Sequence, residues 1–262
     1  RSWKEGGNDA AAVTAWETYV ARFPEGEHTA EVLMSLSEIT GGADARKHLA
    51  TLARDHGESP LVTRALLDLA DGLTDEGNME QAEQHYSDIL ERFPDNELSG
   101  FARYGLAWCL VERDATAEAV EQLDWFHATE PGRAADAELR SSALELLVWC
   151  EGQQGHPQAA QAAWMAFAAL KPDPNALLNG ARTVADSWKA LDKPDEAIQV
   201  YGTLSKNAPA VKVPALIEAG WILLDEGQLS QAETRLAAAA AEAPNDDTVI
   251  ELSFFLAEAL FA

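Results

Sequence analysis

The sequence predicts an all-α fold in which antiparallel helix pairs stack into a solenoid, and three observations lead to this prediction. Prolines recur at a nearly constant spacing, a Gly or Asp precedes most of them at a fixed distance, and the apolar residues between the two keep a helical period. Self-similarity with a period of roughly 20 to 50 residues is typical of repeat proteins.

Seven prolines mark the period. They follow one another at intervals of 36, 34, 37, 41, 37 and 35 residues: Pro24, Pro60, Pro94, Pro131, Pro172, Pro209 and Pro244. A Gly or Asp stands seventeen residues before six of them: Gly7, Gly77, Asp114, Gly155, Asp192 and Gly227. Gly and Asp favour turns, and a proline cannot continue a helix. Each interval therefore predicts a turn, a helix and the end of that helix.

The residues after each turn form one helical stripe. A small residue comes five positions after the turn: Ala12, Ala82, Ala119, Ala160, Ala197 and Ala232. A large apolar residue comes nine positions after it: Trp16, Tyr86, Leu123, Trp164, Tyr201 and Leu236. A step of four residues keeps both on one face of a helix. The small residue predicts the close approach of another helix, and we expect Tyr86, Trp164 and Tyr201 to lie in the core.

The stretch before each turn is also predicted to be helical. Apolar residues precede Gly77 by 11, 8, 7 and 4 positions: Leu66, Leu69, Ala70 and Leu73. The same pattern precedes Gly227, so residues 1–262 are predicted to form a single solenoid of about seven hairpins. The hairpin around Gly41 and Gly42 is degenerate, and the long interval before Pro172 predicts an insertion at residues 131–136.

These features resemble the tetratricopeptide repeat, a helix–turn–helix unit of about 34 residues. The apolar–small pair of the first helix and the Ala, aromatic and terminal Pro of the second carry the resemblance across nearly the whole chain. It implies a right-handed superhelix whose first helices line a concave binding groove. Residues 15–24 and 85–94, which both end in Arg-Phe-Pro, are also similar to repeats of bacterial cell-envelope proteins. That similarity favours a periplasmic or cell-envelope location and leaves a cytoplasmic one open.

Composition and charge exclude several functions. The chain has 19 Lys and Arg against 44 Asp and Glu, a formal net charge of −25. Binding nucleic acid requires clustered Lys and Arg that neutralise phosphates, and anionic lipid attracts basic segments. No apolar run approaches the roughly 18 residues that span a bilayer. We therefore expect a protein or peptide partner, no nucleic acid and no membrane insertion.

The sequence contains no arrangement of residues typical of catalysis. It has no Gly-rich phosphate loop, no nucleophile elbow and no His-Glu-x-x-His zinc helix. We therefore expect a protein that is not an enzyme and holds neither a metal nor another cofactor. Cys109 and Cys150 occupy equivalent positions in adjacent first helices. Stacked helices lie about 8–10 Å apart, too far for a disulfide, so two buried free thiols are predicted.

The resemblance assigns a set of residues to the groove. We select ten of them as the candidate partner-binding site: Phe101, Tyr104, Trp108, Glu145, Trp149, Arg182, Asp186, Lys189, Trp221 and Asp225. Trp recurs at one groove position in Trp108, Trp149 and Trp221, which predicts an aromatic floor. Large aromatic residues on a solvated face are typical anchors for a partner. The alternative is that these rings fill the seams between neighbouring first helices as part of the core.

The predicted function is a non-catalytic scaffold that holds a peptide or a folded partner in the groove. Acidic residues outnumber basic ones there, which favours a partner with basic and apolar side chains. Two alternatives stay open: a structural module of a larger cell-envelope assembly, and an array that serves an absent catalytic domain. Residues 254–261 match the first helix of a repeat, which we call a first-type helix, without the second helix that would pair with it. We therefore expect either a fragment of a longer array or end-to-end self-association through this helix.

Overall fold

A computed structural model describes residues 9–261, and within them it contains fifteen α-helices, one 3₁₀ helix and no strand. The chain divides into two compact units, residues 1–122 and residues 123–262. That residues 1–262 form one solenoid therefore stays a prediction.

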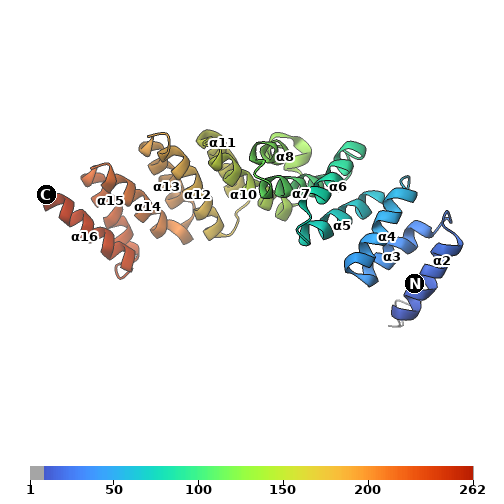
Figure 1. The fold of residues 1–262 in the computed structure, drawn as a ribbon. Helices are drawn as coiled ribbons and strands as arrows, with labels where there is room; N and C mark the ends of the chain where they lie inside the picture. The colour runs from blue at the N-terminus through green and yellow to red at the C-terminus, as the bar shows by residue number, and fades with distance from the viewer. Residues whose placement is uncertain (1–8, 262) are drawn as a thin grey trace. The chain divides into compact units, whose positions relative to one another are not determined.

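The first unit begins with a single helix that packs on a helix pair, followed by further helices in antiparallel order (Figure 1). Its helices are α2 (Asp9–Arg22), α3 (Thr29–Thr40), α4 (Gly42–Asp55), α5 (Val62–Asp75), α6 (Met79–Arg92), α7 (Ser99–Glu112) and the first part of α8 (Thr116–Ala128). Neighbours in the sequence pack on one another from α2 to α7, and the first-type helices α5 and α7 also touch.

The second unit repeats this arrangement. It holds the end of α8, then α9 (Glu130–Arg133), α10 (Ala137–Gln153), α11 (Pro157–Ala169), α12 (Pro174–Lys189), α13 (Pro194–Asn207), η1 (Pro209–Val211), α14 (Lys212–Asp225), α15 (Leu229–Glu242) and α16 (Asp247–Phe261). First-type helices again touch one another, α10 with α12 and α14 with α16. The all-α repeat predicted from the sequence is therefore confirmed within each unit.

The predicted turns adopt the left-handed backbone conformation that Gly and Asp tolerate best. The φ angles are 77°, 61°, 69°, 58° and 67° at Gly77, Asp114, Gly155, Asp192 and Gly227. The sixth predicted turn, at Gly7, lies outside the described residues. The left-handed residue reverses the chain between the two helices, which is why a Gly or Asp recurs at this place in these five repeats.

The predicted stripe of small and large apolar residues forms the core. The alanines of the stripe are at most 1% exposed: Ala12, Ala82, Ala119, Ala160, Ala197 and Ala232. Tyr86, Trp164 and Tyr201 are buried as predicted. Cys109 and Cys150 are buried and unpaired, which confirms the prediction of two free thiols.

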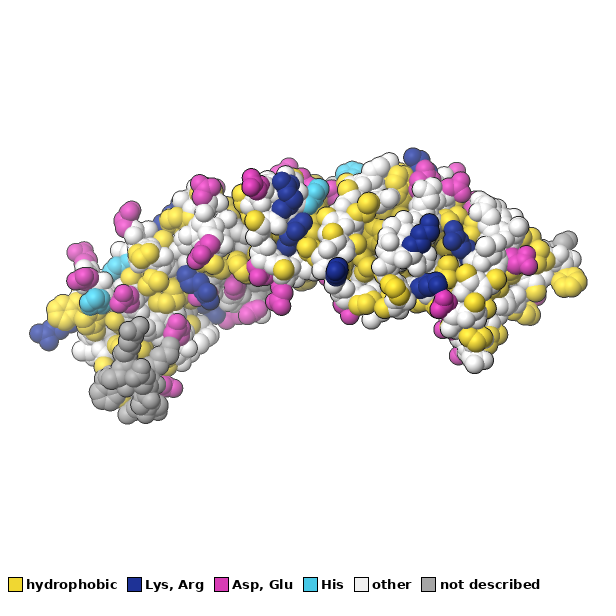
Figure 2. All heavy atoms as spheres, turned by 180° about the vertical axis from the view of Figure 1, so that it is seen from behind, with side chains coloured by type: hydrophobic (Ala, Val, Ile, Leu, Met, Phe, Trp, Pro, Cys, Tyr) yellow, Lys and Arg dark blue, Asp and Glu magenta, His cyan; other side chains and the backbone are white. Residues whose placement is uncertain are grey.

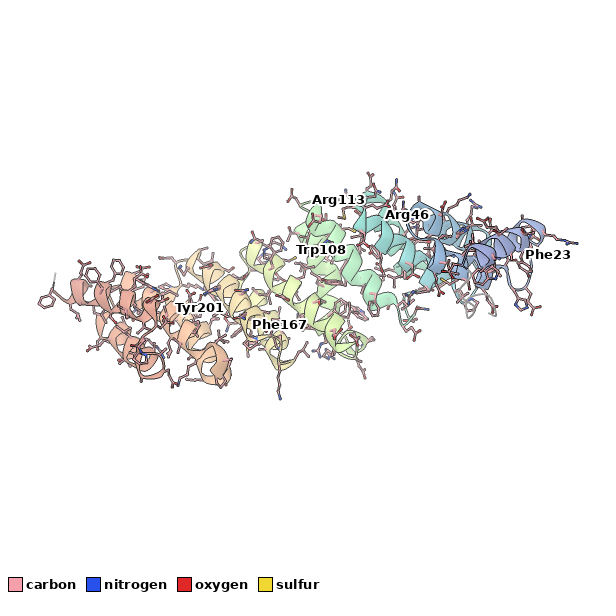
Figure 3. The ribbon with its side chains drawn as sticks, turned by 90° about the horizontal axis from the view of Figure 1, so that it is seen from below. Phe23, Arg46, Trp108, Arg113, Phe167 and Tyr201 are labelled. Carbon is pink, nitrogen blue, oxygen red and sulfur yellow. The ribbon has the colours of Figure 1, made fainter. Side chains whose placement is uncertain are left out.

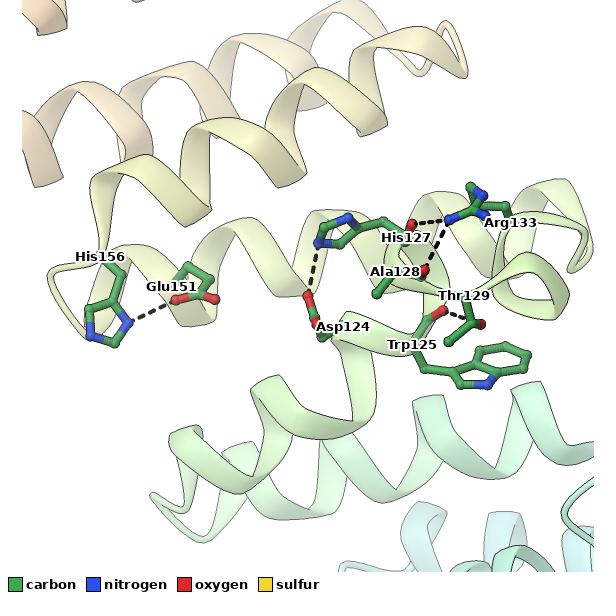
Figure 4. A network of polar contacts seen from close by, with 8 residues as sticks. All are labelled: Asp124, Trp125, His127, Ala128, Thr129, Arg133, Glu151 and His156. Carbon is green, nitrogen blue, oxygen red and sulfur yellow. Dashed lines mark hydrogen bonds and ion pairs between the residues drawn. The ribbon is translucent and has the colours of Figure 1, made fainter.

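The predicted insertion forms an additional turn of helix, α9, after α8. Thr129 caps its N-terminus by accepting a hydrogen bond from the Gly132 N–H at 3.0 Å. Arg133 donates to two carbonyl groups at the end of α8, 2.9 Å to His127 and 3.0 Å to Ala128 (Figure 4). A cation at a helix C-terminus is stabilising because the last carbonyls are otherwise unsatisfied. The insertion thus supplies the cap for the preceding helix.

Candidate partner-binding surface

All ten residues predicted for the groove are exposed or half-buried in the structure. Trp108 and Trp149 are each 40% exposed, although Ala107 and Cys109 beside Trp108, and Cys150 beside Trp149, are fully buried. Both rings are thus only partly buried. Their part in binding stays a prediction.

In the first unit, three of the predicted residues line one cleft between α5 and α7. The cleft has a volume of about 400 Å³. Phe101, Tyr104 and Trp108 of α7 form its aromatic side, and Asp71 and Thr74 of α5 face them. Phe101 and Trp108, at 42% and 40% exposure, keep much of their surface open to solvent (Trp108 is labelled in Figure 3).

The floor of this cleft depends on a glycine. A Cβ atom at Gly105 would lie 2.6 and 2.8 Å from the Cε1 and Cε2 atoms of Tyr86, closer than carbon atoms pack. Because Gly105 has no side chain, the Tyr86 ring passes beneath α7. Its hydroxyl donates a 2.7 Å hydrogen bond to Oδ1 of Asp71 and lies 3.3 Å from the Thr74 hydroxyl. The buried tyrosine therefore holds the carboxylate in place.

The surroundings of Asp71 oppose its ionisation. Burial raises the pKa of the Asp71 carboxyl above its ordinary value, the hydrogen bond from Tyr86 lowers this pKa, and the nearby carboxylates Asp68 and Asp75 raise it. Arg64 lowers the pKa of Asp71 but forms its own 2.6 Å ion pair with Asp68. Burial and the hydrogen bond to Asp71 raise the pKa of the Tyr86 hydroxyl, which therefore stays a donor.

In the second unit, the basic residues predicted for the groove are paired within the chain. Arg182 of α12 forms a 2.7 Å ion pair with Glu218 of α14, and Lys189 lies 3.6 Å from Asp186. The exposed Trp149 belongs to α10, which packs on α12. Both basic residues predicted for this face are thus each paired with a carboxylate of the same unit.

At the C-terminal end, the aromatic series continues beyond the predicted residues. The ring of Trp221 on α14 lies 5.4 Å from that of Phe255 on α16, and Phe254 lies 5.6 Å from Phe255. Phe255 stands one repeat length after Trp221 in the sequence. This spacing was the signal that could have added Phe255 to the predicted residues.

Sequence reasoning also missed part of the cleft in the first unit. Tyr86 was assigned to the core, and at 2% exposure it belongs there, yet its hydroxyl reaches the cleft. The available signal was Gly105, because a glycine inside a helix often has a packing or functional reason. Its effect depends on which side chain lies beneath it, and only the folded structure shows that.

Potential metal ligands do not gather at any one place in residues 9–261. No group of three or more His, Cys, Asp or Glu side chains in this range could hold a metal ion. The two histidine–carboxylate contacts of Figure 4, His127 with Asp124 and His156 with Glu151, are separate pairs of 2.8 and 2.9 Å. Nor does any described helix have the length and apolar character needed to cross a membrane.

The paired helices, the left-handed turns and the solvent-exposed aromatic residues of the first helices define a helical-repeat protein. The model of one family, described as the Tetratricopeptide repeat-like domain, matches residues 9–180. The chain belongs to this family. No curated protein sequence matches the chain significantly.

Several solved structures share the fold. The C-terminal part of a TPR repeat-containing protein from Cytophaga hutchinsonii is 15% identical with a TM-score of 0.60, over 95% of this chain and 96% of that chain. The MamA protein is 15% identical with a TM-score of 0.55, over 70% of this chain and 94% of its own. YrrB, described as a TPR protein with an unusual peptide-binding site, is 16% identical with a TM-score of 0.50, over 78% and 97%. At these identities the similarity shows the fold alone.

Proposed function

We propose that this chain is a non-catalytic scaffold that binds a peptide or a folded partner on the faces that the first-type helices form within each unit. One observation carries the proposal: Trp108 and Trp149 occupy the same repeat position, and each leaves 40% of its surface in solvent. Aromatic residues are enriched among the side chains that dominate binding energy at protein interfaces. YrrB, which shares the fold, is described as having a peptide-binding site, and this supports the same kind of function here.

The charge of the chain favours a basic partner. The formal net charge is −25, and on the face drawn in Figure 2 the Asp and Glu side chains are scattered over both units. A surface with one predominant sign of charge accelerates association with a partner of the opposite sign. Because salt screens such attraction, the association rate should fall as the ionic strength rises.

Selection from a random peptide library tests the proposal. Peptides selected on the wild-type chain should bind the Trp108→Ala and Trp149→Ala double variant at least about tenfold more weakly, since hot-spot aromatics contribute about 2 kcal/mol or more. The control is Phe23→Ala, which removes an aromatic residue of similar exposure, 46%, outside the predicted surface. Peptides that bind the double variant as tightly as wild type would place the partner elsewhere and refute the proposal.

A second candidate function, end-to-end self-association through α16, is favoured by the exposure of that helix. Ile250, Phe254 and Phe261 are 54%, 59% and 94% exposed. Together with Ala257 they form one stripe along α16. The same repeat positions in the other first-type helices lie where these helices meet the second helix of the repeat. A second copy of the chain is the proposed occupant. Light scattering should show a dimer or larger species that Phe254→Ser together with Phe261→Ser dissociates, and a monomer at all concentrations would exclude this candidate.

A further inference from the structure

The cleft between α5 and α7 combines two groups that recognise a cation. Trp108, Phe101 and Tyr104 supply aromatic surface on one side, and the Asp71 carboxylate lies opposite. The face of an aromatic ring attracts an ammonium or guanidinium group, and Trp does so most strongly. The cleft volume of about 400 Å³ lies at the lower end of the roughly 300–1,000 Å³ of ligand pockets, so it suits a single side chain.

The carboxylate in this cleft is oriented but lacks a cationic partner. Tyr86 holds Oδ1 of Asp71 with a 2.7 Å hydrogen bond. Within the part of the chain that the structure describes, no Lys or Arg lies within ion-pair distance of Asp71, and Arg64 is engaged by Asp68. The Oδ2 atom is thus left for a group that comes from outside.

The second unit shows how the same repeat positions behave when a cation is present. Asp186 occupies the position of Asp71, and Trp221 occupies that of Trp108. There Lys189 lies 3.6 Å from Asp186, so the carboxylate is paired within the chain. The residue at the position of Lys189 in the first unit is Thr74, which has no charge.

The residue at the repeat position of Gly105 also differs between the two units. This position is occupied in the second unit by Glu218, which pairs with Arg182 at 2.7 Å. The second unit thus pairs its basic residues with its own carboxylates at these positions, whereas the first unit has a cleft bounded by a glycine. The two units therefore share the acidic and aromatic positions and differ in the source of the cation.

We infer, on the basis of the proposed function, that the cleft between α5 and α7 binds the side chain of a lysine or arginine from a bound peptide. The aliphatic part of that side chain lies along Phe101 and Trp108, and its charged end reaches Oδ2 of Asp71. A neutral side chain of the same length gains only the apolar contact. The cleft thereby selects basic residues at one position of the partner.

The direct test uses blocked amino acids as probes. N-acetyl-lysine-N-methylamide, its arginine analogue and its uncharged norleucine analogue are titrated separately into the wild-type chain. The indole N–H signal of Trp108, assigned by its loss in Trp108→Phe, is followed by nuclear magnetic resonance. The two cationic probes should shift this signal with an affinity about tenfold higher than that of the norleucine probe, and the signals of Trp149 and Trp221 should not move.

Three variants identify the source of the selectivity. Asp71→Asn keeps the acceptor for Tyr86 but removes the charge, and should abolish the preference for the cationic probes. Thr74→Lys places in the first unit the cation that Lys189 supplies in the second, and should block the cationic probes. Asp88→Asn, which removes a half-buried carboxylate of α6 that pairs with Arg92 outside the cleft, should bind them as the wild type does.

Several results would overturn the inference. A shift of the Trp108 signal that is equal for the lysine and norleucine probes would make the cleft merely apolar. An equal response to choline would assign it to small cations rather than to a peptide side chain. If selected peptides bind at the tryptophans without a basic residue, the proposed function stands and this inference fails. If the cationic probes bind while no peptide is selected, the cleft is a cation site and the proposed function fails.

Discussion

Replacing Gly105 by alanine is expected to destabilise the first unit, although alanine is the better helix former. In an open helix position the change from Gly to Ala stabilises by about 1 kcal/mol. At Gly105 the new methyl group would lie 2.6 and 2.8 Å from two carbons of the buried Tyr86 ring. Optimal carbon contacts are about 3.5–4.0 Å, so the ring has to move by about 1 Å.

Two costs follow from this movement. Overpacking of a well-filled core costs about 1–3 kcal/mol. The hydrogen bond from Tyr86 to the Asp71 carboxylate, 2.7 Å long, is lost or weakened, and hydrogen bonds to charged groups contribute about 1.5–3 kcal/mol. With the gain in helix propensity subtracted, the net loss is about 1.5–5 kcal/mol, or a Tm lower by roughly 5–20 °C for a unit of this size.

Thermal unfolding followed by circular dichroism measures this loss, and Gly72→Ala is the matched control. Gly72 lies in α5 of the same unit, and a Cβ there would meet only the Arg46 side chain, at 3.7 and 3.8 Å. These are ordinary contacts, so Gly72→Ala should raise the Tm while Gly105→Ala lowers it. If both variants raise the Tm, the Tyr86 ring does not depend on the absence of a side chain at Gly105, and the account of the cleft floor is wrong.

Three further predictions concern other parts of the chain. Cys109 and Cys150 should react with a thiol reagent only as fast as the protein unfolds locally, because burial raises the pKa of Cys109 and raises that of Cys150 to about 12. Rapid labelling of both thiols in the native protein would contradict this. Gly132→Ala should lower the free energy of unfolding of the second unit, measured by urea denaturation, by about 2–4 kcal/mol, because the new Cβ would lie 2.7 and 2.8 Å from backbone atoms of α8. The control Gly202→Ala should raise this free energy, because a Cβ at Gly202 would have nothing within 4 Å. Asp71→Asn should be at least as stable as wild type at pH 7, because the folded state raises the pKa of Asp71 and therefore loses stability as the carboxyl ionises. The difference in Tm should vanish below the ordinary Asp pKa of about 3.9, where the carboxyl is protonated in both states. A variant that is less stable than wild type at pH 7 would refute the direction of this pKa shift.

The repeat could be predicted from the sequence because its constraints are local. A left-handed turn accepts Gly or Asp, and a crossing of two helices accepts a small residue such as Ala82, so both recur at fixed distances. The exposure of Trp108 could be anticipated by the same counting, since its repeat position faces away from the second helix. These features need only the period and the geometry of a helix.

The cleft could not be predicted in full, because it depends on contacts between repeats. Tyr86, Asp71 and Gly105 lie on three different helices, and each is unremarkable within its own helix. Their relation appears only when α7 packs on α5 and α6 and the tyrosine hydroxyl emerges beside the carboxylate. Charge pairing had the same limit, since the pairing of Arg182 with Glu218 joins residues from two repeats.

The comparison of the two units indicates how a repeat protein acquires a specific site. The alanine of the stripe is the same in six repeats, and replacing it with a larger residue would disrupt helix packing. The exposed position held by Asp71 and Trp108 has no such constraint, so it can carry a carboxylate in one repeat and an aromatic ring in the next. Neighbouring repeats then bring the two side chains to opposite walls of one cleft. The two units differ at two further positions: the first unit has Thr74 and Gly105, whereas the second has Lys189, which lies 3.6 Å from Asp186, and Glu218. A few positions outside the buried stripe therefore change the chemistry of the cleft, while the stripe keeps the fold.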